Sequence, residues 1–246
     1  MKKIIIILII GILVIFTMTG CDGIIPGEGE GEGEGEPEPK VTVLVEAYVA
    51  LGCPHCAKVE PILENLAMEY SRDEMILVEL DPWTDYFTSE TYQRYQWYGL
   101  TGGVPQILFN GLNNNIQGVS TYSVIKNRIE AQLATTPTIK LEASRTASIS
   151  GTVITGKVKN ISNETLTYLV VNGMVFKNRG MTGFRYSVTD IFEEEKVVIS
   201  SLAPGEEKSF TMTIEGLNWT AQNDGVIFVQ SSAHPKKLIR QSVFLD

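Results

Sequence analysis

The sequence predicts two folded parts in series: a mixed α/β sheet flanked by helices, followed by an antiparallel all-β sandwich. Up to about residue 135, apolar strand-like runs alternate with stretches of helical periodicity. At Thr135-Thr-Pro-Thr138 the pattern changes, and short β-rich runs separated by turn residues follow. The length of 246 residues exceeds one average domain, so both parts have enough chain to bury a core.

Residues 1–21 have the pattern of a bacterial export signal. Lys2 and Lys3 precede an apolar run at 4–16, which is too short to span a bilayer comfortably. Met18-Thr-Gly-Cys21 follows and resembles the lipobox of bacterial lipoproteins, with Met18 where leucine is usual. The resemblance implies that Cys21 becomes a lipid-carrying N-terminus; the alternative is an uncleaved anchor helix. Either way, we expect a membrane-anchored protein outside the cytoplasm, on the periplasmic side or at the cell surface.

Residues 22–40 form an acidic linker rich in glycine and glutamate. Alternating Gly and Glu has no apolar face and repels itself, so the segment cannot offset the entropy cost of folding. We expect an extended tether that spans at most about 60 Å. The whole chain has a formal net charge of −9, which argues against nucleic-acid binding.

Residues 41–135 are expected to form the α/β part. Its first apolar run leads directly into a helix, which is typical of a buried central strand. After Cys56, apolar residues recur on one helical face, and Pro61 should kink this helix. The first apolar run is a strand at 41–49. The elements expected after the helix are a strand at 75–80, a helix at 84–98, a strand and turn at 104–111, a loop and short strand at 113–120, and a helix at 123–133.

The stretch Leu51-Gly-Cys-Pro-His-Cys56 is suited to reversible disulfide chemistry. At a helix N-terminus, unpaired N–H groups and the helix dipole favour a thiolate on Cys53, with Cys56 in reach as the resolving thiol. Pro54 suits the first helical turn. A protonated His55 would lower the pKa of the Cys53 thiol further. A stable thiolate is a good leaving group, so the pair should be a strong oxidant.

Two other roles for the cysteines have to be weighed. A zinc site needs four ligands, whereas the chain has one further cysteine and two histidines, so we expect no metal. A purely structural disulfide is the second alternative, but so short a loop constrains little chain entropy. If Cys21 carries lipid, Cys53 and Cys56 remain as one pair and no thiol is left over.

Three motifs resemble the thioredoxin superfamily: Cys53-Pro-His-Cys56, Pro61-Ile-Leu-Glu-Asn-Leu-Ala67 and Gly103-Val-Pro105. The resemblance implies a cis-proline loop opposite the active site. If Pro105 is cis, the backbone of Val104 would be open to pair with a substrate chain; the alternative is an ordinary trans proline that starts a strand.

Glu46 precedes Cys53 by seven residues, close to the usual six for the buried acid of thioredoxins that assists proton transfer. Glu46 is therefore a possible proton-transfer residue, or else a surface carboxylate on an edge strand. The aromatic residues Trp83, Tyr86, Trp97 and Tyr98 either line a peptide groove or pack in the core, and core packing is favoured.

Within this superfamily, Cys-Pro-His-Cys and Gly-Val-Pro are similar to DsbA-type disulfide oxidases, whereas Val104-Pro-Gln-Ile-Leu-Phe-Asn-Gly111 also resembles glutaredoxins. Residues 57–104 number 48, too few for the helical insertion of DsbA-type enzymes. We expect an oxidase of exported protein thiols that needs no cofactor besides its disulfide and is reset by a membrane or soluble redox partner. An exported reductase and a non-catalytic binding module are the alternatives.

Residues 138–246 are expected to form the sandwich. Gly156-Lys-Val-Lys-Asn160 and Leu202-Ala-Pro-Gly-Glu206 resemble Ig-like modules of bacterial surface proteins, and no catalytic constellation accompanies them. We therefore expect a spacer or a docking face. The expected strands lie at 152–158, 165–171, 185–191, 196–199, 209–214, 225–230 and 238–244.

Overall fold

The computed structural model describes residues 39–112, 115–180 and 183–245. Residues Glu38–Asp246 form one compact unit. The predicted signal peptide with its lipobox cysteine, and the linker up to residue 38, lie outside the described residues.

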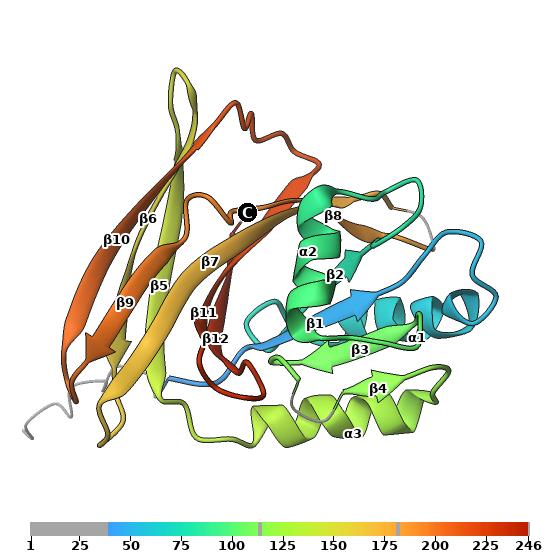
Figure 1. Cartoon of the computed structure of the whole chain (residues 1–246), viewed down its shortest axis with the longest axis horizontal. Helices are drawn as coiled ribbons and strands as arrows, with labels where there is room; N and C mark the ends of the chain where they lie inside the picture. The colour runs from blue at the N-terminus through green and yellow to red at the C-terminus, as the bar shows by residue number, and fades with distance from the viewer. Residues whose placement is uncertain (1–38, 113–114, 181–182, 246) are drawn as a thin grey trace, which may run out of the picture. The chain divides into compact units, whose positions relative to one another are not determined.

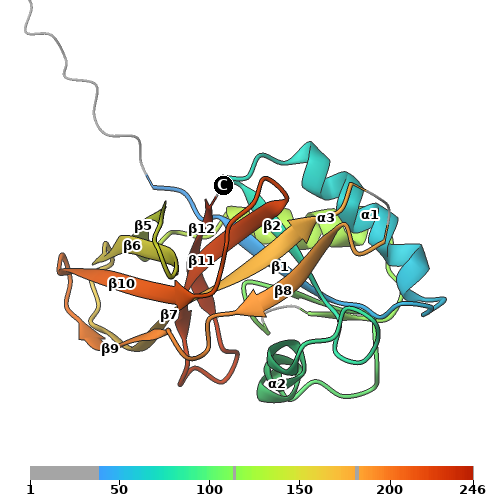
Figure 2. The same ribbon diagram turned by 90° about the horizontal axis from the view of Figure 1, so that it is seen from above.

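A mixed sheet flanked by helices forms the first half of this unit, as expected (Figure 1). Its central strand pairs in parallel with one neighbour and antiparallel with the other, and a two-residue strand closes the edge. Two helices lie on one face of the sheet and the third lies on the opposite face (Figure 2). In chain order the elements are β1 (Val43–Tyr48), α1 (Cys56–Glu69), β2 (Met75–Leu80), α2 (Ser89–Tyr98), β3 (Gln106–Phe109), β4 (Ile116–Gln117) and α3 (Tyr122–Leu133), with α2 alone on its face.

The central strands β1 and β2 are buried along their whole length. Strands covered on both faces have nearly continuous apolar sequences, which is why these runs show no alternation. Each of the two nevertheless carries one glutamate, Glu46 in β1 and Glu79 in β2, and both are fully buried. A buried carboxyl needs hydrogen-bond partners or a proton, so these two residues require an explanation.

Helix α2 begins five residues later than the sequence pattern predicts, because Asp81 organises the preceding turn. The Asp81 carboxylate accepts hydrogen bonds from the backbone N–H groups of Trp83 (3.0 Å), Thr84 (2.8 Å) and Tyr86 (3.0 Å). These bonds compete with helical ones and hold the segment as a turn. The helix then starts after Thr88, which makes a capping box.

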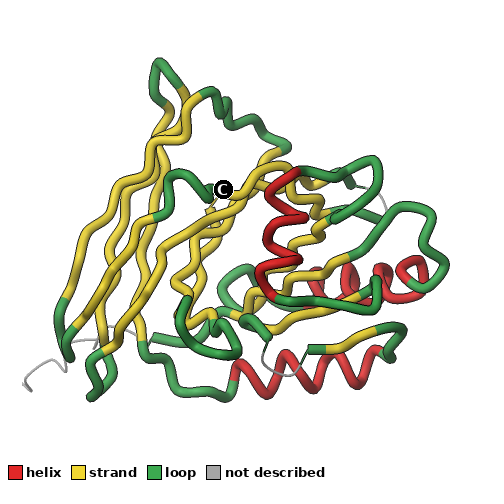
Figure 3. Tube along the Cα trace, in the orientation of Figure 1, coloured by secondary structure: helices red, strands yellow, loops and turns green. Residues whose placement is uncertain are grey.

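The second half of the unit is all-β, and β strands dominate that side of the molecule (Figure 3). Three of its strands form a separate sheet in the order β10-β6-β5. Apolar residues from both sheets, among them Val158, Phe210 and Ile227, form a common core. The strands are β5 (Ile139–Ala147), β6 (Gly151–Asn160), β7 (Leu166–Asn178), β8 (Tyr186–Ile191), β9 (Val197–Leu202), β10 (Glu207–Glu215), β11 (Asn223–Ser231) and β12 (Ile239–Leu245).

One strand of the all-β half continues the sheet of the α/β half. β8 pairs in parallel with β2, where Glu79 faces Ser187, and antiparallel with β7. The resulting sheet has the order β12-β11-β7-β8-β2-β1-β3-β4, with β9 also paired to β7. The sequence pattern indicates a strand at β8 but not its partner in the first half. The division into domains at 41–135 and 138–246, and the Ig-like topology, stay predictions.

The turn before β12 makes a second junction between the halves. Leu112 N–H donates to the Lys236 carbonyl (2.9 Å), and Ile239 N–H donates to the Asn110 carbonyl (3.1 Å). Gly111 lies between these bonds with φ of +92°, and a Cβ at this position would overlap the Lys237 carbonyl oxygen. Only glycine allows the two backbones to approach so closely.

Candidate redox site

Cys53 and Cys56 are joined in a disulfide at the N-terminus of α1. β1 leads into the loop before them, where Gly52 adopts a φ of +74° that a residue with a Cβ disfavours. Cys53 is half-buried, whereas Cys56 is fully buried. An incoming thiolate can therefore reach the sulfur of Cys53 but not that of Cys56.

The Cys53 sulfur lies among backbone polar groups. Cys56 N–H donates to Cys53 Sγ at 3.2 Å, as expected for a sulfur at a helix N-terminus. On another side, the Val104 carbonyl oxygen lies 3.8 Å from the same sulfur, and the Val104–Pro105 peptide bond is cis. The Cys56 N–H group would stabilise a Cys53 thiolate once the disulfide is reduced.

His55 occupies the N-cap position of α1, and its side chain is exposed and makes no capping hydrogen bond. The residue adopts helical dihedral angles, with φ of −80° and ψ of −36°. Its effect on the Cys53 thiol stays a prediction, as does the substrate role of Val104 and Pro105.

Glu46 is fully buried in the central strand β1, so the alternative of an edge-strand surface carboxylate is wrong. Its oxygens accept hydrogen bonds from Arg94 Nε (2.5 Å) and Tyr98 Oη (2.6 Å). Burial alone would lower the pKa of Arg94, but the Glu46 carboxylate holds it above its usual value. Arg94 thus neutralises Glu46, and the proton-transfer role of Glu46 stays a prediction. The sequence analysis did not identify Arg94; the signal that could have found it is a single arginine within an aromatic-rich helix.

Three further carboxyls are buried close to the start of β8: Glu60 and Glu64 on α1, and Glu79 on β2. The sequence analysis missed all three. Each accepts one backbone N–H from the segment that leads into β8: Glu64 from Gly183 (2.7 Å), Glu60 from Phe184 (3.2 Å) and Glu79 from Tyr186 (2.7 Å). Glu60 and Glu64 are four residues apart and therefore lie on the same side of α1. The sequence could show this spacing but not the N–H donors, which lie more than 100 residues further along the chain.

Burial raises the pKa of all three carboxyls. That of Glu79 rises to about 8, partly offset by the Tyr186 N–H, and the other oxygen of Glu79 is buried without a hydrogen-bond partner. The pKa of Glu60 is raised by burial and further by the charges of Glu64 and Asp81. At neutral pH, Glu79 is therefore mostly protonated.

A cavity of about 330 Å³ opens beside the disulfide. Both halves of the chain line it: Cys53 and Glu60 come from the α/β half, and Gly183 and Phe184 come from the segment before β8. The remaining lining residues are Ala50, Leu51, Gly52, Pro54, Ala57 and Tyr86.

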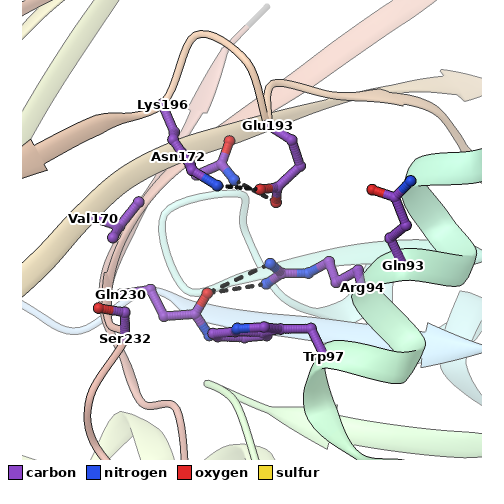
Figure 4. A pocket seen from close by; sticks show the side chains of 9 residues that line it. All are labelled: Gln93, Arg94, Trp97, Val170, Asn172, Glu193, Lys196, Gln230 and Ser232. Carbon is purple, nitrogen blue, oxygen red and sulfur yellow. Dashed lines mark hydrogen bonds and ion pairs between the residues drawn. The ribbon is translucent and has the colours of Figure 1, made fainter.

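A second cavity, of about 310 Å³, lies between α2 and the strands β7 and β11 (Figure 4). Arg94 faces it, and the polar groups around it are paired with one another: Gln230 accepts from the Arg94 guanidinium, and Glu193 binds Lys196 and Asn172. It contains no cysteine. Its other lining residues are Gln93, Trp97, Val170 and Ser232.

The four aromatic residues singled out in the sequence do not share one groove. Tyr86 lines the cavity beside the disulfide, and Trp97 lines the second cavity. Tyr98 is buried against Glu46, whereas Trp83 is 47% exposed and packs edge-on against Tyr95.

No protein-family model and no curated protein sequence matches this chain. Among solved structures it is similar to HBP35 of Porphyromonas gingivalis, with a TM-score of 0.66 and 14% identity over 83% of this chain and 74% of that chain. A domain of the outer membrane lipoprotein Omp28 from the same organism matches over 45% of this chain and 88% of that chain, at 14% identity and a TM-score of 0.27. Spo0M, a sporulation control protein from Bacillus subtilis, matches over 45% and 50%, at 16% identity and a TM-score of 0.29.

The similarity to HBP35 concerns the fold, and its extent exceeds either half of the chain alone. The joined α/β and all-β arrangement is therefore shared with another protein. The other two similarities are too low to carry an argument. The Cys53–Cys56 disulfide at the start of α1 and the cis Val104–Pro105 bond fit the thioredoxin resemblance expected from the sequence motifs.

Proposed function

We propose that this protein is a thiol–disulfide oxidoreductase that oxidises exported protein thiols outside the cytoplasm. The observation that carries the proposal is the Cys53–Cys56 disulfide, which has one half-buried and one buried sulfur at a helix N-terminus. A protein that used this bond only as a staple would gain little from so short a loop.

The exchange runs in two steps that balance in electrons. A substrate thiolate attacks Cys53 Sγ, the Cys53–Cys56 bond breaks, and the Cys56 sulfur leaves with the electron pair and takes up a proton. A second substrate thiolate then attacks the substrate sulfur of the mixed disulfide and releases Cys53 as a thiolate. The substrate loses two electrons and gains a disulfide, and a disulfide-bearing or other oxidising partner must restore the Cys53–Cys56 bond.

The surroundings of Cys53 favour this direction. The Cys56 N–H donates to Cys53 Sγ at 3.2 Å, and it would stabilise the Cys53 thiolate that the second step releases. A more stable thiolate makes the reduced form more stable and the disulfide more oxidising. The half-buried Val104 backbone, whose carbonyl lies 3.8 Å from the same sulfur, provides hydrogen-bonding groups for an extended substrate chain.

Cysteine variants of the full-length chain test the proposal with a model dithiol peptide. Cys53→Ser and Cys56→Ser should both fail to oxidise the dithiol peptide, because neither variant can form the Cys53–Cys56 disulfide. When Cys56→Ser is given the disulfide form of the peptide instead, its Cys53 thiolate should attack that disulfide, release one peptide thiolate and accumulate as a mixed disulfide, because the resolving thiol is missing. Cys21→Ser is the matched control and should oxidise the peptide as the unchanged protein does. Unaltered turnover in both active-site variants would refute catalysis, and a strongly reducing measured potential would refute the oxidising direction.

We further propose that the protein is tethered to a membrane through lipid on Cys21. In the part of the chain that the structure describes, no helix has the length and apolar character needed to cross a membrane. The support for the tether comes from the signal-like residues 1–21 and the acidic linker. Metabolic labelling with a fatty acid should mark the unchanged protein but not Cys21→Ser, and equal labelling of both would refute the tether.

A further inference from the structure

The cavity beside the disulfide has the size of a side-chain subsite. Its volume of about 330 Å³ is at the lower end of ligand-binding pockets. Because Cys53 itself lines this cavity, a residue close to the reacting cysteine of a bound polypeptide would be near its opening. The cavity is therefore placed to select substrates.

Most of its wall is apolar. Ala50, Ala57 and Pro54 contribute aliphatic surface, and the rings of Tyr86 and Phe184 lie with centroids 5.0 Å apart. Phe184 belongs to the all-β half, so its part of the wall is present because the segment before β8 is docked against α1. Such a wall suits a chain of methylene groups.

One carboxyl, that of Glu60, interrupts the apolar lining. Glu60 is 6% exposed, and among the described residues its hydrogen-bond donor is Phe184 N–H, which binds Oε1. Glu64 and Asp81 add negative charge close to it. A carboxylate in this position is poorly solvated and repelled by its neighbours, and a cation in the cavity would relieve both penalties.

We propose that this cavity is a subsite for a lysine or arginine side chain that flanks the reacting cysteine of a protein substrate. The methylene groups of the side chain would pack against Tyr86 and Phe184, and its cationic end would bind Glu60. The proposal deepens the proposed oxidoreductase function and rests on it. It assigns the all-β half a part in substrate selection, through Phe184.

The test uses three cysteine-pair peptides that differ only at the residue next to one cysteine, which is lysine, norleucine or glutamate. Norleucine retains the methylene chain of lysine without its charge. With the full-length protein, we expect kcat/KM for oxidation of the lysine peptide to exceed that of the norleucine peptide about tenfold, the effect of one charge-assisted hydrogen bond. The glutamate peptide should react more slowly than the norleucine peptide.

Glu60→Gln should reduce the ratio of kcat/KM for the lysine peptide to that for the norleucine peptide to about one, since the apolar wall remains and the charge is gone. Both rates are measured on the same protein, so a general change in activity does not alter this ratio, and continued oxidation of the norleucine peptide shows that the variant is folded. Glu69→Gln, at an exposed carboxylate on the same helix, is the matched control and should retain the preference for lysine.

The outcomes separate this subsite from the proposed function. Oxidation of all three peptides at equal rates, or a lysine preference that persists in Glu60→Gln, would refute the subsite and leave the oxidoreductase proposal intact. Failure to oxidise any of the three peptides would refute the oxidoreductase proposal, and the subsite with it.

Discussion

Protonation of Glu79 should make the protein more stable in mild acid than in mild base. The pKa of this fully buried carboxyl rises from 4.5 to about 8, because burial penalises its charged form. When the pKa of a group is higher in the folded state than in the unfolded state, the group contributes its full stabilisation of the folded state at pH values below its unfolded pKa. That stabilisation is lost as the pH rises through the folded value, here between about pH 4.5 and 8.

The size of the loss follows from the two pKa values. A difference of about 3.5 between them, at about 1.4 kcal/mol for each pH unit, amounts to about 5 kcal/mol once the pH is above 8. This is a large part of the stability of an ordinary domain. Glu60 and Glu64 shift in the same direction, whereas exposed carboxyls such as Glu74 shift in the opposite one.

Glu79→Gln isolates the contribution of Glu79, because glutamine has the shape of the protonated acid and never ionises. Urea unfolding at pH 5, 7 and 9 gives the free energy of unfolding at each pH. With rising pH, this free energy should fall less steeply for Glu79→Gln than for the unchanged protein. At pH 9 the variant should be the more stable of the two. The control Glu215→Gln, at an exposed carboxylate, should follow the unchanged protein. Parallel curves for Glu79→Gln and the unchanged protein would refute the reasoning.

Three further predictions concern other sites. Gly111→Ala should lower the free energy of unfolding by about 2–4 kcal/mol in urea titrations, because the alanine Cβ would overlap the Lys237 carbonyl oxygen at a positive φ. A loss below about 0.5 kcal/mol would contradict the close approach of the two backbones at this junction. Arg94→Met should cost about 3–5 kcal/mol by leaving the Glu46 carboxylate buried without its partner, and adding Glu46→Gln should restore part of the loss; no recovery would show that the cost lies in packing. His55→Ala should raise the pKa of the Cys53 thiol and make the pair less oxidising, as followed by thiolate absorbance against pH, and an unchanged titration would exclude His55 as a tuner.

The sequence predicted those features that depend on neighbouring residues. β1 and the start of α1 follow from an apolar run next to Cys53 and Cys56, and the helical periodicity after Cys56 places α1 correctly. The cis bond before Pro105 was an expectation from the family resemblance. The start of α2 was missed because a single side chain, Asp81, binds three backbone N–H groups and delays the helix.

Features that join distant segments could not be predicted. The pairing of β8 with β2 joins Glu79 to Ser187, 108 positions further along the chain, and nothing in either strand specifies the other locally. The burial of Glu60, Glu64 and Glu79 has the same origin, because their donors lie in the segment before β8 and at the first residue of β8. In the sequence of α1 alone, Glu60 and Glu64 look like ordinary charged residues on the polar face of a helix.

The pairing of β8 with β2 also constrains the order in which the chain can mature. Synthesis proceeds from the N-terminus, so β1, α1 and β2 are present while the strand that covers the β2 edge has not yet emerged. Until residues 186–191 arrive, that edge presents unpaired N–H and C=O groups and is a template for association with other chains. Thr42, beside β1, must wait still longer, since Gln241 accepts its N–H from 199 residues away. A nascent chain that stalls before β8 would carry Cys53 and Cys56 on an unfinished sheet, and we expect it to need a holding chaperone until β8 is made.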